Sequence, residues 1–171
     1  GVPGSIGGAV RMNAGGHGSD IAASLTGVHL LDLRTARRAW VPAGELGLHF
    51  RGSRLSDHQV VLDARLQLAY GDAEEAEATL TEIVRWRREH QPGGQNAGSV
   101  FVNPIPGELP AARLIDQLGL RGFRVGGAVV SDKHANFIQA GDGATAADVR
   151  AVIEHVRAAV LDHTGIELRS E

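Results

Sequence analysis

The sequence predicts an α+β protein built in two parts. A first block, rich in glycine and in alternating apolar residues, ends near residue 70, and the block after it carries helical periods between short strand patterns. Apolar residues make up 43% of the 171 residues, which is enough to bury a core. Aromatic residues make up only 4%, so aliphatic side chains must fill that core. We expect the domain boundary between residues 69 and 70.

The first block, residues 1–69, predicts a glycine-rich loop followed by strands. Seven glycines fall within residues 1–18, which indicates an irregular loop where the backbone passes close to another group. Residues 25–33 and 60–70 alternate apolar and polar side chains, as half-buried strands do. A turn is expected over residues 41–48.

The second block, residues 70–171, begins with a predicted helix over residues 73–90. Asp72 and Glu75 form a capping-box pattern at its start, and four apolar residues at helical spacing are expected to face inward. These four are Ala76, Leu80, Ile83 and Val84.

Shorter elements follow. A loop is expected over 91–98, a short strand over 99–102 and a short helix that ends at Gly119. Strands are expected over 125–130 and 136–139. Thr145 with Asp148 predicts the start of a long helix that Gly165 ends, and a last strand begins at residue 166. The residues expected to face the core from this helix are Val149, Val152, Ile153, Val156 and Val160.

Composition excludes several classes of function. A net charge of −3 gives no attraction to nucleic acid or to anionic membranes, and the absence of cysteine excludes disulfides and thiolate metal sites. No apolar run approaches the ~20 residues that a membrane span needs, and the N-terminus lacks a signal-peptide pattern. We expect a cytoplasmic monomer with no metal. The apolar first residues also suggest that the chain was cut from a longer protein.

Five stretches could carry chemistry. The first, residues 1–9, has even odds of being a tight turn or a phosphate cradle, because it lacks both the dinucleotide fingerprint and a Walker lysine. Arg51 and Ser99 have commoner structural roles as a surface charge and a strand-end hydroxyl. Residues 131–137 form either a ligand loop or an ordinary hairpin turn, and Glu171 by itself indicates nothing. The residues alone therefore do not predict a reaction.

Five motifs, in order and at similar spacing, resemble those of the UDP-N-acetylenolpyruvoylglucosamine reductase family, the compact subgroup. The motifs of this sequence are GVPGSIGGAVRMNAGGHG, FRGS, NAGSVFVNP, LIDQLGLRGFRVGGAVVSDKHANFI and GIELRSE. The resemblance covers nearly the whole chain, and the last two motifs are too long for a chance match. It implies an enzyme of cell-wall (peptidoglycan) precursor synthesis that lacks its N-terminal part here.

The resemblance also implies the fold, the cofactors and the substrate. Residues 1–69 resemble the second half of a flavin-binding domain of the vanillyl-alcohol-oxidase type (VAO/PCMH), and residues 70–171 resemble a substrate-binding α+β domain. FAD is the implied cofactor and NADPH the implied reductant. The implied reaction converts UDP-N-acetylglucosamine enolpyruvate to UDP-N-acetylmuramate.

Site residues follow from the resemblance, position by position. Arg51 matches the arginine that holds the enolpyruvyl carboxylate, Glu171 a glutamate that acts on the same carboxylate, and Ser99 the serine that protonates the intermediate. Residues expected to bind the flavin are Gly4, Ser5, Ile6, Gly7, Asn13 and Ala14. Residues expected to bind the substrate are Asn103, His134 and Asn136.

Three positions depart from the family pattern: Phe50 replaces a tyrosine, and His90 and Val102 each replace a lysine that is common in the family. These departures affect the expected substrate affinity more than the reaction type. Two alternatives remain: another flavin oxidoreductase of the same fold, and an inactive fragment that retains only sugar-nucleotide binding.

Overall fold

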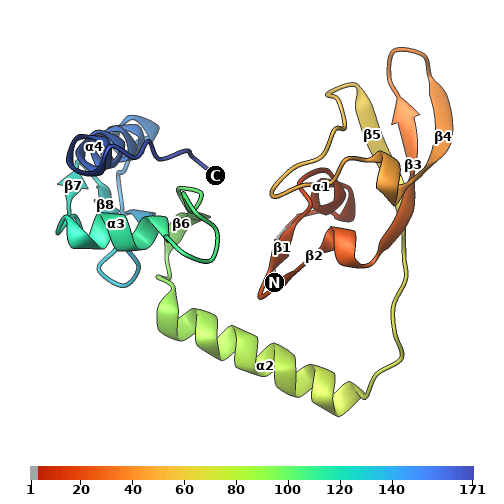
Figure 1. The fold of residues 1–171 in the computed structure, drawn as a ribbon, viewed down its shortest axis with the longest axis horizontal. Helices are drawn as coiled ribbons and strands as arrows, with labels where there is room; N and C mark the ends of the chain where they lie inside the picture. The colour runs from red at the N-terminus through yellow and green to blue at the C-terminus, as the bar shows by residue number, and fades with distance from the viewer. Residues whose placement is uncertain (1–3) are drawn as a thin grey trace. The chain divides into compact units, whose positions relative to one another are not determined.

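The structure is a computed structural model that describes residues 4–171 (Figure 1). The chain divides into two compact units, Gly1–Ala76 and Glu77–Glu171, and each is described by itself. Both units contain helices and antiparallel strands, so the predicted α+β class is confirmed. The domain boundary expected between residues 69 and 70 stays a prediction. The beginning of the glycine-rich stretch, including Gly1, lies outside the described residues.

The first unit is organised around a three-stranded antiparallel sheet of order β4-β3-β5. These strands are β3 (Leu25–Asp32), β4 (Arg37–Pro42) and β5 (Gln59–Leu66), so the two predicted strands are confirmed. The Asp32 carboxylate accepts the backbone N–H groups of Arg34 and Thr35, both at 2.9 Å, and so closes the tight β3–β4 turn. Those bonds lower the pKa of Asp32. Trp40 on β4 meets the ring of His29 edge-on at 5.1 Å.

A six-residue helix, α1 (Ile6–Arg11), forms where the sequence predicted only a loop. Ser5 caps it, since its hydroxyl accepts the Gly8 N–H at 3.0 Å. Val10 is fully buried, and a Cβ on Gly7 would lie 3.4 Å from the Val61 carbonyl oxygen. Packing against β5 therefore stabilises a helix that its glycines disfavour.

Small elements complete the first unit. The predicted turn over 41–48 is confirmed as the end of β4 followed by a 3₁₀ turn. The elements are β1 (Gly15–Gly16), β2 (Ser19–Asp20), η1 (Ile21–Ala23) and η2 (Ala43–Glu45). The buried core of the unit is Val10, Leu25, Val28, Leu30, Leu46 and Leu55.

The helix α2 (Ala73–His90) has the predicted bounds. The Asp72 carboxylate accepts the N–H groups of Glu74 and Glu75 at 2.9 and 3.0 Å, which explains where the helix begins. The predicted inward face is wrong for this chain, because α2 has no buried residue and Leu80 is 62% exposed. Helical spacing predicts an apolar stripe but not what covers it. Trp86 on α2 stacks on His90, with ring centroids 4.5 Å apart.

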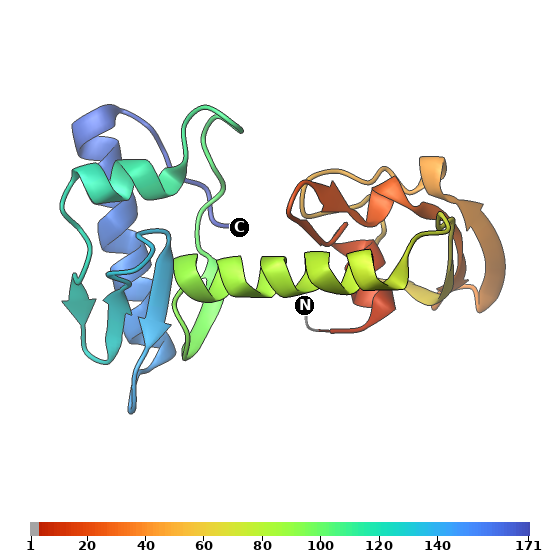
Figure 2. The same cartoon turned by 90° about the horizontal axis from the view of Figure 1, so that it is seen from below.

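The second unit is a four-stranded antiparallel sheet of order β6-β9-β8-β7, with α4 against it (Figure 2). The elements are β6 (Gln95–Ser99), α3 (Ala111–Gln117), β7 (Arg124–Val125), β8 (Ala128–Val130), β9 (Phe137–Ala140) and α4 (Ala146–Thr164). Val152, Val156 and Val160 of α4 are buried as predicted, and Val149 and Ile153 pack beside them.

Both ends of α4 form as the sequence predicted. Thr145 and Asp148 make a complete capping box, and Gly165 takes the left-handed conformation, with φ 70°, that ends the helix. The backbone and side-chain bonds to Thr145 lower the pKa of Asp148. The predicted end of α3 at Gly119, with φ 66°, is also confirmed.

Three strand predictions in this unit were wrong. The loop expected over 91–98 contains β6, an edge strand whose polar residues have no apolar period. The single strand expected over 125–130 is a hairpin that turns at Gly126 and Gly127, where a Cβ on Gly127 would lie 2.6 Å from Ala144. The strand expected from residue 166 is one antiparallel bridge, between Phe101 and Ser170.

Two searches of residues 4–171 bear on function. No helix in that range is long and apolar enough to cross a membrane. No cluster of three or more histidine, aspartate or glutamate side chains in the same range could hold a metal ion.

Candidate functional site

Arg51 lies at the tip of a tight hairpin in the first unit. The backbones of His49 and Gly52 exchange both hydrogen bonds, at 3.0 and 3.1 Å, so Phe50 and Arg51 form the turn. Arg51 has φ 53°, a left-handed conformation that costs a non-glycine residue about 1–3 kcal/mol. The Phe50 ring lies 4.7 Å from the centre of the guanidinium, close enough for a cation–π contact. The backbone of Arg51 therefore has a strained conformation that the neighbouring structure must impose.

Gly52 allows the hairpin to close. A Cβ at this position would lie 2.5 Å from Nε2 of His49, closer than real contacts. The His49 ring is oriented by an exposed bond from its Nδ1 to the Gly47 carbonyl oxygen at 2.9 Å. A carbonyl only accepts, so Nδ1 of His49 carries the proton. A side chain after Arg51 would therefore have to turn the His49 ring aside.

The residues expected to bind the flavin differ in what they leave exposed. Gly4 has φ 125° with open space where a Cβ would be, and Ile6 is 59% exposed. Ser5 caps α1, and Gly7 lies against β5. The N–H of Ala14 bonds to the carbonyl oxygen of Ala9 at 2.8 Å. This surface of small residues and exposed backbone leaves room for a flat group to approach.

Asn13, by contrast, is only 3% exposed and has φ 41°. Its side-chain amide donates to the Asp20 carboxylate at 2.8 Å and to the His49 carbonyl at 3.1 Å. Its oxygen accepts the Ala22 N–H at 3.0 Å. These bonds use the side chain inside the unit, so any flavin contact at this position would come from its backbone.

The backbone segments that carry Ser99 and Glu171 are neighbours in the second unit. Phe101 pairs with Ser170, and the Glu171 N–H donates to the Val100 carbonyl at 2.9 Å. Glu171 therefore stands opposite Val100, one residue from Ser99. Ser99 is the last residue of β6 and pairs with Phe137 of β9. Arg51 belongs to the other unit and is described only there.

Asn136 holds the strand that follows Ser99. Its side chain accepts the Phe101 N–H at 3.0 Å and donates to the Phe101 carbonyl at 2.8 Å, and its own carbonyl accepts the Val100 N–H at 2.9 Å. Asn136 is 4% exposed and Phe101 is 2% exposed. The Asn136 side chain thus replaces a strand neighbour for Phe101, and its expected contact with substrate stays a prediction.

The other two substrate-site predictions have different surroundings. The side-chain oxygen of Asn103 accepts the N–H of Ala111, the first residue of α3, at 3.1 Å. His134 is partly buried, and its Nδ1 accepts the Asn136 N–H at 3.2 Å, so Nε2 carries the proton of the neutral ring. Burial, followed by the charge of Arg121, lowers the pKa of His134 below its usual 6.5. At neutral pH His134 therefore presents a neutral N–H donor.

Two residues that the sequence did not single out lie next to the Arg51 hairpin. The Arg11 guanidinium bonds to the carbonyl of Leu55, and the Ser53 hydroxyl bonds to the carbonyl of Arg11. Ser53 lies within the FRGS motif, but nothing in the local pattern indicates a partner 42 residues away. Only the folded chain shows these contacts.

Comparison with known proteins defines the class of the protein. Residues 89–171 match the family model described as UDP-N-acetylenolpyruvoylglucosamine reductase, C-terminal domain. The crystal structure of the UDP-N-acetylenolpyruvylglucosamine reductase of Thermus caldophilus superposes with a TM-score of 0.84 at 35% identity, covering 100% of this chain and 61% of that one. The chain therefore shares the mixed α+β fold of that reductase over part of its length.

Sequence relatives agree with this similarity. The UDP-N-acetylenolpyruvoylglucosamine reductases of Heliobacterium modesticaldum and Gloeobacter violaceus are 46% and 45% identical over the whole chain. The chain covers 54% and 58% of those two proteins, a little over half of their length. The chain is a homologue of the UDP-N-acetylenolpyruvoylglucosamine reductases and corresponds to part of such a protein.

Proposed function

We propose that this chain provides the substrate-handling part of a flavin-dependent reductase that converts UDP-N-acetylglucosamine enolpyruvate to UDP-N-acetylmuramate. Family membership across the whole chain supports the reaction. The observation that supports the proposal is the ladder, which makes the backbone segments of Ser99 and Glu171 neighbours: Glu171 stands opposite Val100, the residue after Ser99. In this proposal the protein works in the bacterial cytoplasm and acts on a small molecule.

Arg51 is assigned to the carboxylate of the enolpyruvyl group. Hydride addition to the methylene carbon pushes negative charge onto the neighbouring carbon and its carboxylate. A guanidinium offers a rigid fork of donors for that charge, and a donor fixed in advance needs no reorganisation during the reaction. The strained turn, with φ 53° at Arg51, fits this role because it fixes the backbone position from which the Arg51 side chain extends.

Ser99 is assigned as the proton donor to the carbon next to the carboxylate. A serine hydroxyl is a weak acid, but the carbanion is a strong base, so the proton transfer runs downhill. General acid assistance of this kind is typically worth ~10²–10⁴ in rate. The bonds that Asn136 makes to Val100 and Phe101 fix the backbone beside Ser99.

Glu171 is assigned to the same carboxylate. Two carboxylates attract each other only through a shared proton or a bridging donor, so Glu171 would have to be protonated or bridged during the reaction. Asn103 and His134 are assigned to the substrate as hydrogen-bonding groups, and the neutral Nε2–H of His134 suits a phosphate or sugar oxygen. Asn136 acts mainly by holding the strand.

The surface around α1 fits FAD. Gly4, Gly16 and Gly18 leave open space where side chains would be, and Ile6 and Met12 expose apolar groups of the kind that contact a flat ring. FAD, once reduced by NADPH, would supply the hydride. Gly4, Ser5, Ile6, Gly7, Asn13 and Ala14 would hold it through small side chains and backbone groups.

The test is Ser99→Ala in the native full-length polypeptide that carries these residues. We expect NADPH still to bleach the flavin absorbance, while its return on addition of the enolpyruvyl sugar nucleotide slows by ~10²-fold or more. Ser170→Ala, an exposed serine of the facing segment, is the matched control. Normal reoxidation in Ser99→Ala would exclude the proton-donor role.

One observation favours a second function. The chain covers only 54–58% of the two reductases compared above, so the chain by itself could be a sugar-nucleotide-binding module without redox activity. Purified residues 1–171 without a flavin absorbance band, but with UDP-N-acetylglucosamine binding by calorimetry, would support the module.

A further inference from the structure

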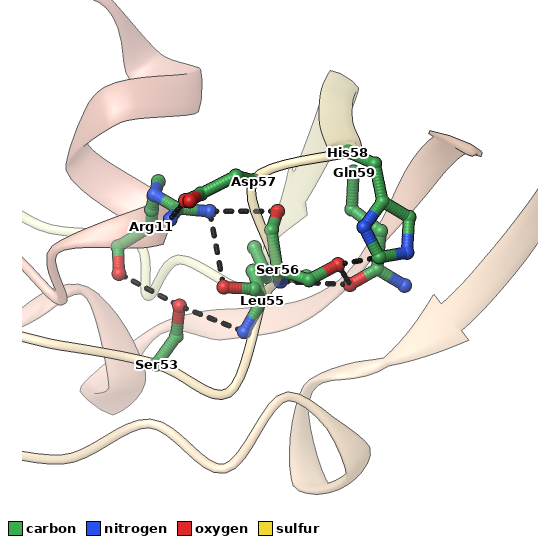
Figure 3. Close-up of polar contacts among 7 residues, drawn as sticks. All are labelled: Arg11, Ser53, Leu55, Ser56, Asp57, His58 and Gln59. Atoms are coloured by element: carbon green, nitrogen blue, oxygen red, sulfur yellow. Dashed lines mark hydrogen bonds and ion pairs between the residues drawn. The ribbon is translucent and has the colours of Figure 1, made fainter. Parts of the chain in front are cut away.

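The end of α1 bonds to the segment 53–57, which follows the Arg51 turn (Figure 3). Nη1 of Arg11 donates to the carbonyl oxygens of Leu55 and Ser56, both at 3.0 Å, and Nη2 donates to the Asp57 carboxylate at 2.7 Å. In return, the Ser53 hydroxyl donates to the Arg11 carbonyl at 2.7 Å. Arg11 thus bonds to the outgoing strand of the hairpin through both its side chain and its backbone.

A second contact reaches the incoming strand. The Asn13 side chain donates to the His49 carbonyl at 3.1 Å, two residues before Arg51. Asn13 is itself held by Asp20 and Ala22, so it is a fixed donor. We call Arg11, Asn13 and Ser53 the clasp. The clasp binds both strands of the hairpin to the segment that ends α1.

The hairpin has few bonds of its own. Besides the His49–Gly52 pair, only the Arg54 N–H to Leu46 carbonyl bond, at 2.9 Å, joins its two sides in the described backbone. Leu46 and Leu55 anchor its base in the core. A short two-stranded hairpin is at best marginally stable alone, and this one carries a strained turn. The position of its tip must therefore depend on outside contacts.

The outgoing strand also has a fixed direction. The Gln59 side chain accepts both the N–H and the hydroxyl of Ser56 at 3.0 Å, as Figure 3 shows, and Gln59 begins β5. The Ser56 carbonyl also accepts the Gln59 N–H at 3.0 Å, so a residue of the sheet holds this carbonyl beside Arg11. The clasp is built against a rigid element and not against a loose loop.

We propose that Arg11, Asn13 and Ser53 are positioning residues that set Arg51 relative to α1. This inference rests on the proposed function, in which Arg51 binds the substrate carboxylate and α1 lies at the flavin. The two groups that must be aligned for hydride transfer are then joined by direct bonds within one unit. The clasp acts through Arg51 and does not touch the substrate.

The ion pair is the less important part of the Arg11 contacts. The Asp57 side chain is fully exposed, and an exposed ion pair contributes little to stability. The two carbonyl bonds are partly buried. Without Arg11 the Leu55 carbonyl would lose its donor, whereas the Ser56 carbonyl would keep its bond from the Gln59 N–H at 3.0 Å. Asp57→Asn should therefore change little, whereas Arg11→Met should release the hairpin.

The test compares Arg11→Met, Ser53→Ala and the conservative variant Arg11→Lys in the native full-length polypeptide. Asp57→Asn and Arg157→Met are the controls. Arg157 also pairs with an exposed carboxylate, that of Glu167 at 3.2 Å, but lies in the second unit. Its side chain is 42% exposed against 39% for that of Arg11, so the two arginines are closely matched.

The first measurement is hydrogen exchange of the peptide that covers residues 46–56. Loss of one partly buried hydrogen bond corresponds to roughly tenfold easier local opening, so Arg11→Met and Ser53→Ala should each raise exchange of the Gly52 and Arg54 amides about tenfold. Arg11→Lys should restore part of the protection. The two control variants should exchange as the wild type does.

The second measurement is steady-state turnover with the enolpyruvyl sugar nucleotide. A displacement of about 1 Å at a substrate-holding group can cost on the order of 10²-fold. A loosened hairpin should therefore raise KM roughly tenfold and lower kcat less. Wild-type exchange at Gly52 in both Arg11→Met and Ser53→Ala would overturn the clasp. Unchanged turnover in Arg51→Met would instead overturn the proposed function and leave the exchange result standing.

Discussion

Replacement of Asn136 should separate its structural role from any contact with substrate. Its side chain satisfies both backbone groups of Phe101, a residue that is 2% exposed. A buried backbone group left without its hydrogen bond costs ~1–3 kcal/mol. Two such groups are left in Asn136→Ala, and water entering the vacated space would recover part of the loss. We expect about 2–4 kcal/mol less stability.

The assay is urea denaturation followed by far-ultraviolet circular dichroism. Asn136→Asp is the sharper variant, because a carboxylate can still accept from the Phe101 N–H but cannot donate to the Phe101 carbonyl. A protonated carboxyl can donate, so folding should raise the pKa of the introduced group above its usual ~3.9. The deficit of Asn136→Asp relative to wild type should therefore be smallest in acid and grow as the pH rises above ~4.

Two results would refute this reasoning. A loss below about 0.5 kcal/mol in Asn136→Ala, the size of an ordinary surface change, would mean that the Phe101 backbone finds other partners. A pH-independent deficit in Asn136→Asp would mean that donation to the Phe101 carbonyl does not matter. Asn103→Ala is a suitable comparison, because that exposed side chain makes a single bond, to the Ala111 N–H.

Three further predictions concern single residues. Arg51→Gly should melt at a higher temperature than Arg51→Ala, by the equivalent of ~1 kcal/mol, because glycine accepts φ 53° without strain. Both variants should lose substrate-dependent flavin reoxidation. Gly165→Ala should lower the free energy of unfolding by about 1 kcal/mol in urea titrations, because φ at this position is 70°. His134 has a lowered pKa, so its contribution to stability should be complete above pH 6.5 and decline as the pH falls from 6.5 through the lowered pKa. In His134→Gln the urea midpoint should therefore change less between pH 7 and pH 5 than it does in the wild type. An equally steep pH dependence in both proteins would contradict this assignment.

The parts of the fold that the sequence predicted are those with local causes. A capping box joins residues three apart, and a left-handed glycine ends a helix within one turn, so Thr145 and Gly165 identify both ends of α4. The strands β3 and β5 are half buried, and their alternation is visible for the same reason.

The errors in the fold have equally specific reasons. The edge strand β6 is polar and exposed along most of its length, so no apolar period marks it. The hairpin at Gly126 and Gly127 has a local signal, a Gly-Gly pair between two apolar runs. Helix α1 forms through packing of Val10 and Gly7 against a strand more than 50 residues away, which local propensity does not contain.

The sequence predicted which residues belong to the candidate site, but not which contacts they make. The family motifs gave the numbers of Arg51, Ser99 and Glu171, but not the ladder that brings the last two together. Asn13 and Asn136 were predicted to meet ligands, yet their amides bond to backbone groups 36 and 35 residues away. Amide side chains that bind ligands and those that bind backbone look alike in a sequence.

The placement of the two tryptophans offers a practical benefit for all these experiments. The chain has two, Trp40 in the first unit and Trp86 in the second. Each lies against an imidazole, that of His29 or His90, which can quench indole emission when protonated. Replacing either indole by phenylalanine would leave one fluorophore that reports on a single unit. Melting of the unit that contains α1 and of the unit that contains Ser99 could then be followed separately in one polypeptide.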